Sequence, residues 1–234
     1  MAPAPAHRPR EHANPDRRLE IAKSIVASKI HNQAFLVKKY KYHDTSAEYD
    51  ENISEISRRA VLLNTASSVD EIMGVEGMAA RHYWNCLRRL LKTPVFTRRE
   101  YRPSPDYVNA LLNISYAFLA NEITTCLTAK NFDLEIGFLH SIHYGRNSLA
   151  LDMMEEFRSP VVDSWILSVL NKNQLKAEHF HVKNGDWRLT DEGFRKYCGL
   201  FHDQILPWRE KFRTQSNNLK SALMKGETYK PYSE

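Results

Sequence analysis

Apolar side chains recur at helical spacing along most of this 234-residue chain. Between Arg17 and Val37 they return about every 3.6 residues, which predicts an amphipathic helix. Further helices are predicted over about 51–64, 108–130, 148–157, 160–170, 190–212 and 215–225. One more helix is predicted to begin at a cap formed by residues 67–71. No set of strands sufficient for a catalytic sheet remains. We therefore predict an all-α fold.

A short alternating segment near residues 179–191 interrupts the helical pattern. The step Asn184-Gly185 separates His179-Phe180-His181-Val182 from Trp187-Arg188-Leu189, which is typical of a tight β-hairpin. Its two histidines alternate along one strand and would share a face. We expect them to be ordinary surface residues rather than metal ligands.

The first 16 residues differ from the rest in composition. Pro3, Pro5, Pro9 and Pro15 lie among Ala, His and Arg, so this stretch cannot form a helix and has little apolar surface to bury. We expect a disordered leader over residues 1–16 and one helical domain over 17–234.

Charge is unevenly distributed around a net value of +5. Residues 81–102 carry seven basic side chains against Glu100, whereas residues 131–163 carry six acids against Arg146 and Arg158. A basic and an acidic segment on one chain suit a metal site within a surface that binds a polyanion. Moderately basic proteins with no nucleic-acid role are common, so charge alone leaves the function open.

Cysteine usage and hydropathy narrow the class of protein. Cys86, Cys126 and Cys198 form no CxxC pair, which argues against a disulfide framework or a structural zinc site and favours reduced thiols. No apolar run approaches the roughly 20 residues needed to cross a bilayer. We expect the bacterial or archaeal cytoplasm as the compartment.

Candidate chemistry gathers around one histidine and several acids. His140 ends the segment Gly137-Phe138-Leu139-His140, and Asp152, Glu155 and Glu156 follow on an otherwise apolar predicted helix, where they would share a face. Buried carboxylates need a cation or hydrogen-bond donors, and imidazole with carboxylates suits Mn²⁺ or Mg²⁺. The alternative is a solvated helix face with an ordinary histidine nearby.

A further carboxylate, Glu76, lies between Gly74 and Gly77 in the helix that follows the 67–71 cap. The glycines lower helicity and leave room for another backbone or a phosphate to approach. The alternative is that Gly77 simply permits close helix packing.

Six or more ordered blocks give the chain a family resemblance. The blocks are Lys29-Ile30-His31-Asn32-Gln33, Gly74-Val75-Glu76-Gly77 with Ala80 and Tyr83, Arg102-Pro103-Ser104-Pro105-Asp106 with Val108-Asn109-Ala110-Leu111-Leu112, Gly137-Phe138-Leu139-His140, Leu151-Asp152-Met153-Met154-Glu155-Glu156-Phe157-Arg158, Val161-Val162-Asp163 and Tyr229-Lys230-Pro231-Tyr232. Through these blocks the chain resembles the CRISPR-associated spacer-acquisition integrase and endonuclease family over about Arg17 to Tyr232.

The resemblance implies a site. It places the metal ligands, and with them the catalytic residues, at Glu76, His140 and Glu155, with Asp152 and Tyr83 as supporting residues and Glu156 as a surface or supporting carboxylate. The ion would be Mn²⁺ or Mg²⁺. Backbone phosphates of DNA would be bound by basic residues that precede the long apolar helix, namely Arg81, Arg88, Arg89, Arg98, Arg99 and Arg102.

The resemblance also implies an activity and partners. The 3′-hydroxyl ends of spacer DNA would be joined to a CRISPR repeat by transesterification, without ATP, which agrees with the absence of a GxxxxGK[ST] motif. The implied partners are double-stranded DNA, a second copy of the chain, a small CRISPR-associated subunit and a reverse transcriptase. The alternatives are a metal-dependent DNA nuclease that does not join ends, a transposon-borne integrase relative, and a non-catalytic DNA-binding module.

The chain departs from the family pattern at its beginning. Family members usually start with a β-rich domain that helps to build the homodimer and contacts the small subunit, and here the resemblance starts at the helical domain. We expect that part to be missing or to be supplied by another polypeptide.

Overall fold

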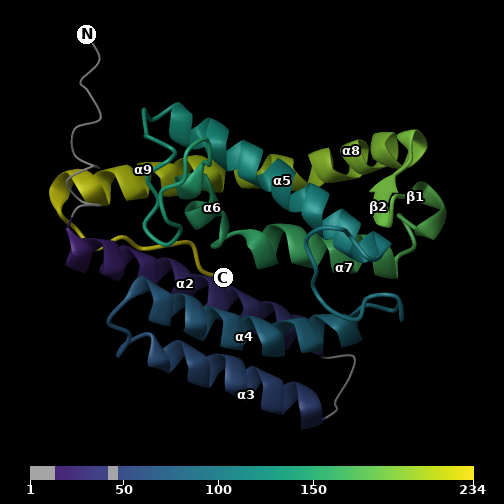
Figure 1. The fold of residues 1–234 in the computed structure, drawn as a ribbon, viewed down its shortest axis with the longest axis horizontal. Coiled ribbons are helices and arrows are strands. Elements are labelled where there is room, and N and C mark those ends of the chain that lie inside the picture. The colour runs from purple at the N-terminus through teal and green to yellow at the C-terminus, as the bar shows by residue number, and fades with distance from the viewer. Residues whose placement is uncertain (1–13, 42–46) are drawn as a thin grey trace.

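The computed structural model describes residues 14–41 and 47–234, and these residues form two layers of helices (Figure 1). The first layer holds α2 (Pro15–Tyr40), α3 (Ala47–Leu62) and α4 (Val69–Leu90), which pack on one another. The second layer holds α5 (Tyr107–Thr128), α6 (Ser148–Met154), α7 (Ser164–Asn171), α8 (Asp191–Ile205) and α9 (Arg209–Lys225). The prediction of a mainly helical fold is confirmed.

Side-chain caps set the starts of the long helices. Asn14 accepts hydrogen bonds from the backbone amides of Asp16 and Arg17, so α2 begins at Pro15, two residues inside the predicted leader. The rest of that leader, residues 1–13, lies outside the described residues. Ser68 caps α4 as predicted, by accepting from the amide of Glu71. The second predicted helix starts earlier than expected, at Ala47.

The predicted hairpin is confirmed. Strand β1 (Phe180–Lys183) pairs antiparallel with β2 (Asp186–Leu189), and Lys183 lies opposite Asp186. Asn184 and Gly185 both have positive φ, at 54° and 76°, as a two-residue turn of this kind requires. The predicted same-face pair of histidines is wrong. His179 is buried in the short helix η3 (Ala177–His179) before the strand, and His181 is exposed on β1.

Two predicted helices end elsewhere because of proline. α8 ends at Ile205, a single turn η4 (Leu206–Trp208) contains Pro207, and α9 then begins at Arg209, whereas the break was predicted between 212 and 215. α6 ends at Met154, three residues before the predicted end at Phe157, and a π-helix, η2 (Arg158–Asp163), follows. Pro160 has no amide hydrogen to donate to the carbonyl of Glu156, and the Asn32 side chain donates to that carbonyl instead, at 2.8 Å.

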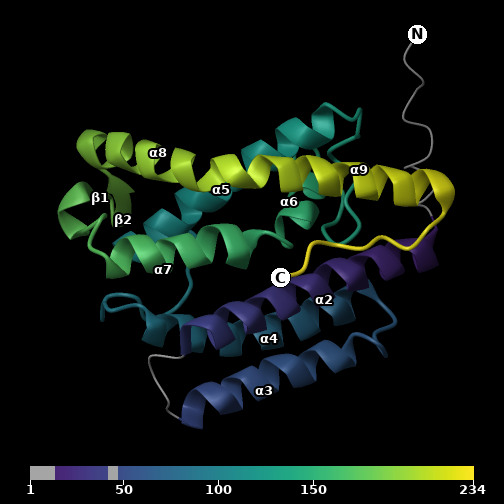
Figure 2. The ribbon, with the colours of Figure 1, turned by 180° about the vertical axis from the view of Figure 1, so that it is seen from behind.

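The final residues run as an extended segment along α2, between the two layers (Figure 2). Asn32 donates to the carbonyl of Tyr232 and accepts from the amide of Glu234. The Tyr232 ring stacks on Phe157 with ring centroids 5.2 Å apart. The segment therefore joins α2 to the region just beyond α6.

Two remaining sequence predictions concern cysteines and membrane spans. All three cysteines are free thiols; Cys86 is buried, and Cys126 and Cys198 are half-buried. Among the described residues, no helix combines the length and apolarity that a membrane crossing needs.

Candidate active site

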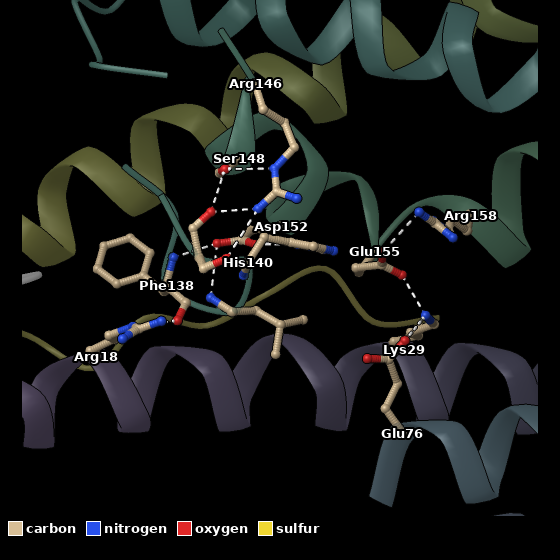
Figure 3. Close-up of polar contacts among 12 residues, drawn as sticks. Arg18, Lys29, Glu76, Phe138, His140, Arg146, Ser148, Asp152, Glu155 and Arg158 are labelled. Carbon is tan, nitrogen blue, oxygen red and sulfur yellow. Dashed lines mark hydrogen bonds and ion pairs between the residues drawn. The ribbon is translucent and has the colours of Figure 1, made fainter. Parts of the chain in front are cut away.

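Two of the predicted ligands meet on one lysine. Glu76 from α4 and Glu155, directly after α6, both contact the ammonium group of Lys29 from α2 (Figure 3). Lys29 Nζ lies 2.6 Å from Glu155 Oε2 and forms a short ion pair with Glu76 Oε1. Three helical segments far apart in sequence thus bring two carboxylates to a single cationic centre.

Glu155 is held ionised by its neighbours. Its side chain is 3% exposed, and Arg158 Nη2 lies 3.0 Å from its second oxygen. Burial acts to raise the pKa of Glu155, but Arg158 and Lys29 outweigh burial and the pKa lies below its ordinary value. Burial likewise opposes the charge on Lys29, yet Glu155 and Glu76 raise the pKa of Lys29 above its usual range. Glu155 and Lys29 are therefore both charged near neutral pH.

His140 lies beside this cluster on a loop that Asp152 holds in place (Figure 3). Asp152 is fully buried and accepts hydrogen bonds from the amides of Phe138, Leu139 and His140 at 2.5, 3.0 and 2.9 Å. The same carboxylate lies 2.6 Å from His140 Nδ1. This contact orients the imidazole and leaves Nε2 as the nitrogen that faces another partner.

Gly137 is required by the same loop. A Cβ atom at this position would lie 2.8 Å from both Asp152 Oδ2 and the carbonyl oxygen of His140. The glycine in Gly137-Phe138-Leu139-His140 therefore lets the loop close onto the carboxylate.

The three predicted ligands are not gathered into one preformed metal site. Among residues 14–41 and 47–234, no group of three or more His, Cys, Asp or Glu side chains is placed to hold an ion. Lys29 and Arg158 pair with the two glutamates, and Asp152 pairs with the imidazole of His140. The donor set still fits a divalent cation, because two anionic carboxylates already converge on a positive charge beside an oriented imidazole.

The prediction that Asp152, Glu155 and Glu156 share one helix face is wrong. The helix ends at Met154, and each carboxylate faces a different partner. Glu156 was expected to be a surface or a supporting carboxylate; it is fully buried, so the surface alternative is wrong. It accepts from the Tyr229 hydroxyl at 2.5 Å and from the Tyr232 amide at 2.7 Å. Burial outweighs these bonds and raises the pKa of Glu156 to about 8.

Tyr83 lies on α4, about two helical turns beyond Glu76. Its hydroxyl donates to the buried carboxylate of Asp163 at 2.6 Å, and Tyr116 donates to the other oxygen of Asp163 at 2.5 Å. The Arg158 guanidinium lies 4.8 Å from the centre of the Tyr116 ring. Tyr83 thus supports the site only indirectly, through the residues that pack around Arg158.

The glycines beside Glu76 do not serve close helix packing. A Cβ atom added at Gly74 or at Gly77 would meet nothing within 4 Å, and both positions are exposed. That alternative is therefore wrong, and the surface of α4 next to Glu76 is open to an approaching ligand.

The six arginines predicted to bind DNA divide into two groups. Arg89 pairs with Glu48 of α3, Arg98 pairs with Glu100 at 2.6 Å, and Arg99 donates to Asn109 and Asn113 of α5. The others, Arg81, Arg88 and Arg102, are exposed and form no ion pair among the described residues, whereas Arg89 and Arg98 are exposed but paired with acids. Arg99 has a structural role, and the exposed residues without an ion pair are the better candidates for phosphate contacts.

A hollow of about 520 Å³ opens beside His140. Its lining includes Arg18, Arg146, Ser68, Met73 and Leu139, together with the acids Asp16 and Asp70. Arg18 Nε donates to the carbonyl of Phe138, and Arg146 Nη2 donates to that of Ser141, so both arginines brace the His140 loop (Figure 3). A larger hollow, of about 760 Å³, lies between α5 and α9 and contains no predicted ligand.

Sequence reasoning missed Lys29, Arg158, Arg18 and Arg146 as site residues. Lys29 and Arg158 lay inside the blocks that carried the family resemblance, which was the available signal for them. The sequence did not identify Arg18 as a site residue, because nothing in it indicates that the start of α2 lies against the His140 loop. It did not identify Arg146 either, because the contact of Arg146 with Ser141 is seen only in the folded loop.

Solved structures share this fold. A Cas1 protein from Thermotoga maritima is 25% identical and superposes with a TM-score of 0.85 over 97% of this chain and 72% of that one. A chain of a Cas6-RT-Cas1–Cas2 complex gives 0.90 at 24% identity, over 97% of this chain and 26% of that chain. A casposase bound to integration product gives 0.83 at 23% identity, over 100% and 71%. The last two likenesses show the fold alone.

Curated relatives and a family model match this chain in sequence. CRISPR-associated endonuclease Cas1 1 of Thermus thermophilus is 32% identical over 98% of this chain and 73% of its own length. CRISPR-associated endonuclease Cas1 of Leptospira interrogans is 36% identical over 76% of this chain and 73% of its own length. The model for CRISPR associated protein Cas1 matches residues 7–203. These matches show that the chain belongs to the Cas1 family of CRISPR-associated proteins.

Proposed function

We propose that the chain is the catalytic helical part of a metal-dependent DNA integrase and endonuclease of CRISPR adaptation. The observation that carries the proposal is the convergence of Glu76 and Glu155, from α4 and the end of α6, on one buried positive charge beside His140. The curated relatives are named endonucleases, which supports a nuclease activity for the same site.

Glu76, Glu155 and His140 would hold Mn²⁺ or Mg²⁺, with Nε2 as the imidazole donor. When bound, the ion supplies a Lewis acid that activates a hydroxyl and offsets charge on the attacked phosphate. Asp152 contributes by holding His140 Nδ1, and Arg158 contributes by keeping Glu155 anionic. Each of these roles follows from a contact in the cluster.

The proposed reaction exchanges one phosphodiester for another. The 3′-oxygen of a spacer end attacks a repeat phosphorus, a new P–O bond forms, and the bond to the leaving 3′-oxygen breaks. Water in place of the 3′-hydroxyl gives endonuclease cleavage. No nucleotide cofactor is needed, because the number of phosphodiester bonds is conserved.

The hollow beside His140 is the proposed entry for DNA. Arg18 and Arg146 would contact backbone phosphates there, and the exposed arginines Arg81, Arg88 and Arg102 would extend the contact along the duplex. Such contacts predict that DNA affinity falls steeply with added salt. A homodimer, a small CRISPR-associated subunit and a reverse transcriptase are proposed as partners from the family resemblance.

A joining assay and a cleavage assay on the same DNA test the proposal. In Glu76→Gln, His140→Ala and Glu155→Gln we expect both activities to fall more than about a hundredfold, because each variant loses a metal donor. Glu76→Gln is the cleanest variant, since Glu76 is 21% exposed and Lys29 keeps its ion pair with Glu155.

The exposed Glu51 of α3 provides the matched control, and Glu51→Gln should keep both activities. Cleavage without joining in the unaltered protein would favour the nuclease alternative. Undiminished activity in Glu76→Gln would contradict the proposed site.

A further inference from the structure

Lys29 is the most deeply buried cation in contact with the two glutamates. Its side chain is 7% exposed, compared with 28% for Arg158. It arises from the middle of α2, and its ammonium lies between Glu76 on one side and Glu155 on the other (Figure 3). The ammonium therefore occupies the position where a cation shared by both carboxylates would lie.

A second cation between the glutamates would meet the Lys29 ammonium there. Lys29 Nζ is 2.6 Å from Glu155 Oε2 and forms an ion pair with Glu76 Oε1. Arg158 forms an ion pair with the other Glu155 oxygen, Oε1. A divalent ion bound to both carboxylates has to approach their oxygens to about 2.0–2.5 Å. An ammonium left in place would then lie within a few ångströms of a like charge, which is strongly unfavourable in a buried setting.

The two cations differ in how easily they can move. The Arg158 guanidinium is stacked over the Tyr116 ring at 4.8 Å, so it is fixed by packing as well as by charge. Lys29 has a flexible four-carbon stem, and among the described residues its ammonium pairs with Glu76 and Glu155 alone. Lys29 is thus the group that can leave.

We propose that the Lys29 ammonium is an internal counter-ion that holds Glu76 and Glu155 together and is displaced when a divalent metal binds. This inference rests on the proposed function, because it assigns the metal to these carboxylates. Lys29 is then a positioning residue that keeps two buried anions from repelling each other, and competition from its charge weakens the affinity for the ion.

Replacement of Lys29 by a neutral side chain should therefore strengthen metal binding. We expect Lys29→Met to bind Mn²⁺ at least about tenfold more tightly than the unaltered chain, as measured by isothermal titration, because no ion pair has to be broken. The metal-free variant should melt at a lower temperature, since two buried carboxylates lose their counter-charge. Added Mn²⁺ should raise its melting temperature more than it raises that of the unaltered chain.

Two further variants keep the test decisive. Lys29→Gln retains a hydrogen-bond donor for the glutamates and should also bind Mn²⁺ more tightly, which covers the case in which Lys29→Met does not fold. Lys38→Met removes an exposed lysine from the same helix and should leave the affinity unchanged. A purely structural Lys29 would instead give variants with equal or weaker Mn²⁺ binding, and that result would overturn the inference.

Glu76→Gln separates failure of this inference from failure of the proposed function. Loss of Mn²⁺ binding in Glu76→Gln with no gain in the Lys29 variants would sink the displacement mechanism alone. Equal Mn²⁺ binding by Glu76→Gln and the unaltered chain would place the ion elsewhere and overturn both.

Discussion

Asp152 and Glu155 are three residues apart and both are buried, yet their charges are balanced in opposite ways. Asp152 accepts from three backbone amides of the His140 loop. Glu155 faces two side-chain cations, Lys29 and Arg158. Backbone amides cannot leave without opening the loop, whereas a lysine side chain can swing away. Burial alone therefore does not indicate that a carboxylate binds a metal. The kind of group that stabilises the buried carboxylate, backbone amide or mobile side chain, is the better indicator.

Glu156 and Asp163 belong with Asp152 in this comparison. Glu156 is held by Tyr229 and the amide of Tyr232, and Asp163 by the hydroxyls of Tyr83 and Tyr116. These donors are fixed by the packing of buried rings or by backbone. We therefore assign these carboxylates to stability and Glu155 with Glu76 to ion binding.

The largest stability effect should come from Asp152. Asp152→Ala leaves three loop amides without their acceptor, so we expect the free energy of unfolding to fall by about 3 kcal/mol or more in urea denaturation. Joining activity should be lost as well, because His140 is no longer oriented. A variant of unchanged stability would break the distinction between the two kinds of carboxylate.

Removal of one fixed donor from Glu156 should have an intermediate effect. Tyr229→Phe keeps the buried ring but deletes the hydroxyl that donates to Glu156 at 2.5 Å. We expect a loss of about 1 to 2 kcal/mol in the free energy of unfolding, with Mn²⁺ affinity unchanged. Weaker Mn²⁺ binding in this variant would show that the C-terminal segment also serves the metal site.

The smallest effect should be a pH dependence at Asp163. Burial outweighs the two tyrosine hydrogen bonds and raises the pKa of Asp163 to about 6. The folded chain then binds this proton more tightly than the unfolded chain, so stability is gained as pH falls through 6. Relative to Asp163→Asn, the unaltered protein should gain about 1 kcal/mol between pH 7.5 and pH 5. A flat or opposite difference between the two denaturation series would contradict this assignment.

Local signals in the sequence predicted much of the fold. The pattern of apolar residues predicted α2 and α5, the serine cap predicted the start of α4, and Asn184-Gly185 predicted the hairpin turn. The errors lie where proline acts on a neighbouring turn, as at Pro207, and where a side chain from another helix, Asn32, completes an interrupted turn. Tertiary contacts of this kind leave no periodic trace.

The site was predictable only in part. Glu76, His140 and Glu155 followed from the family resemblance, but the sequence could not show that Lys29 lies between the two glutamates, 47 residues from Glu76 along the chain. The support from Asp152 could not be distinguished from ion binding either, because a carboxylate one turn from Glu155 looks the same in both roles until the loop amides are seen.

Anomalous scattering from crystals of the chain grown with Mn²⁺ tests the central claim most directly. The account predicts one strong manganese peak within about 2.0–2.5 Å of a Glu76 oxygen, a Glu155 oxygen and His140 Nε2, with the Lys29 ammonium moved out of the gap. A manganese peak elsewhere, with Lys29 still between the two glutamates, would contradict it.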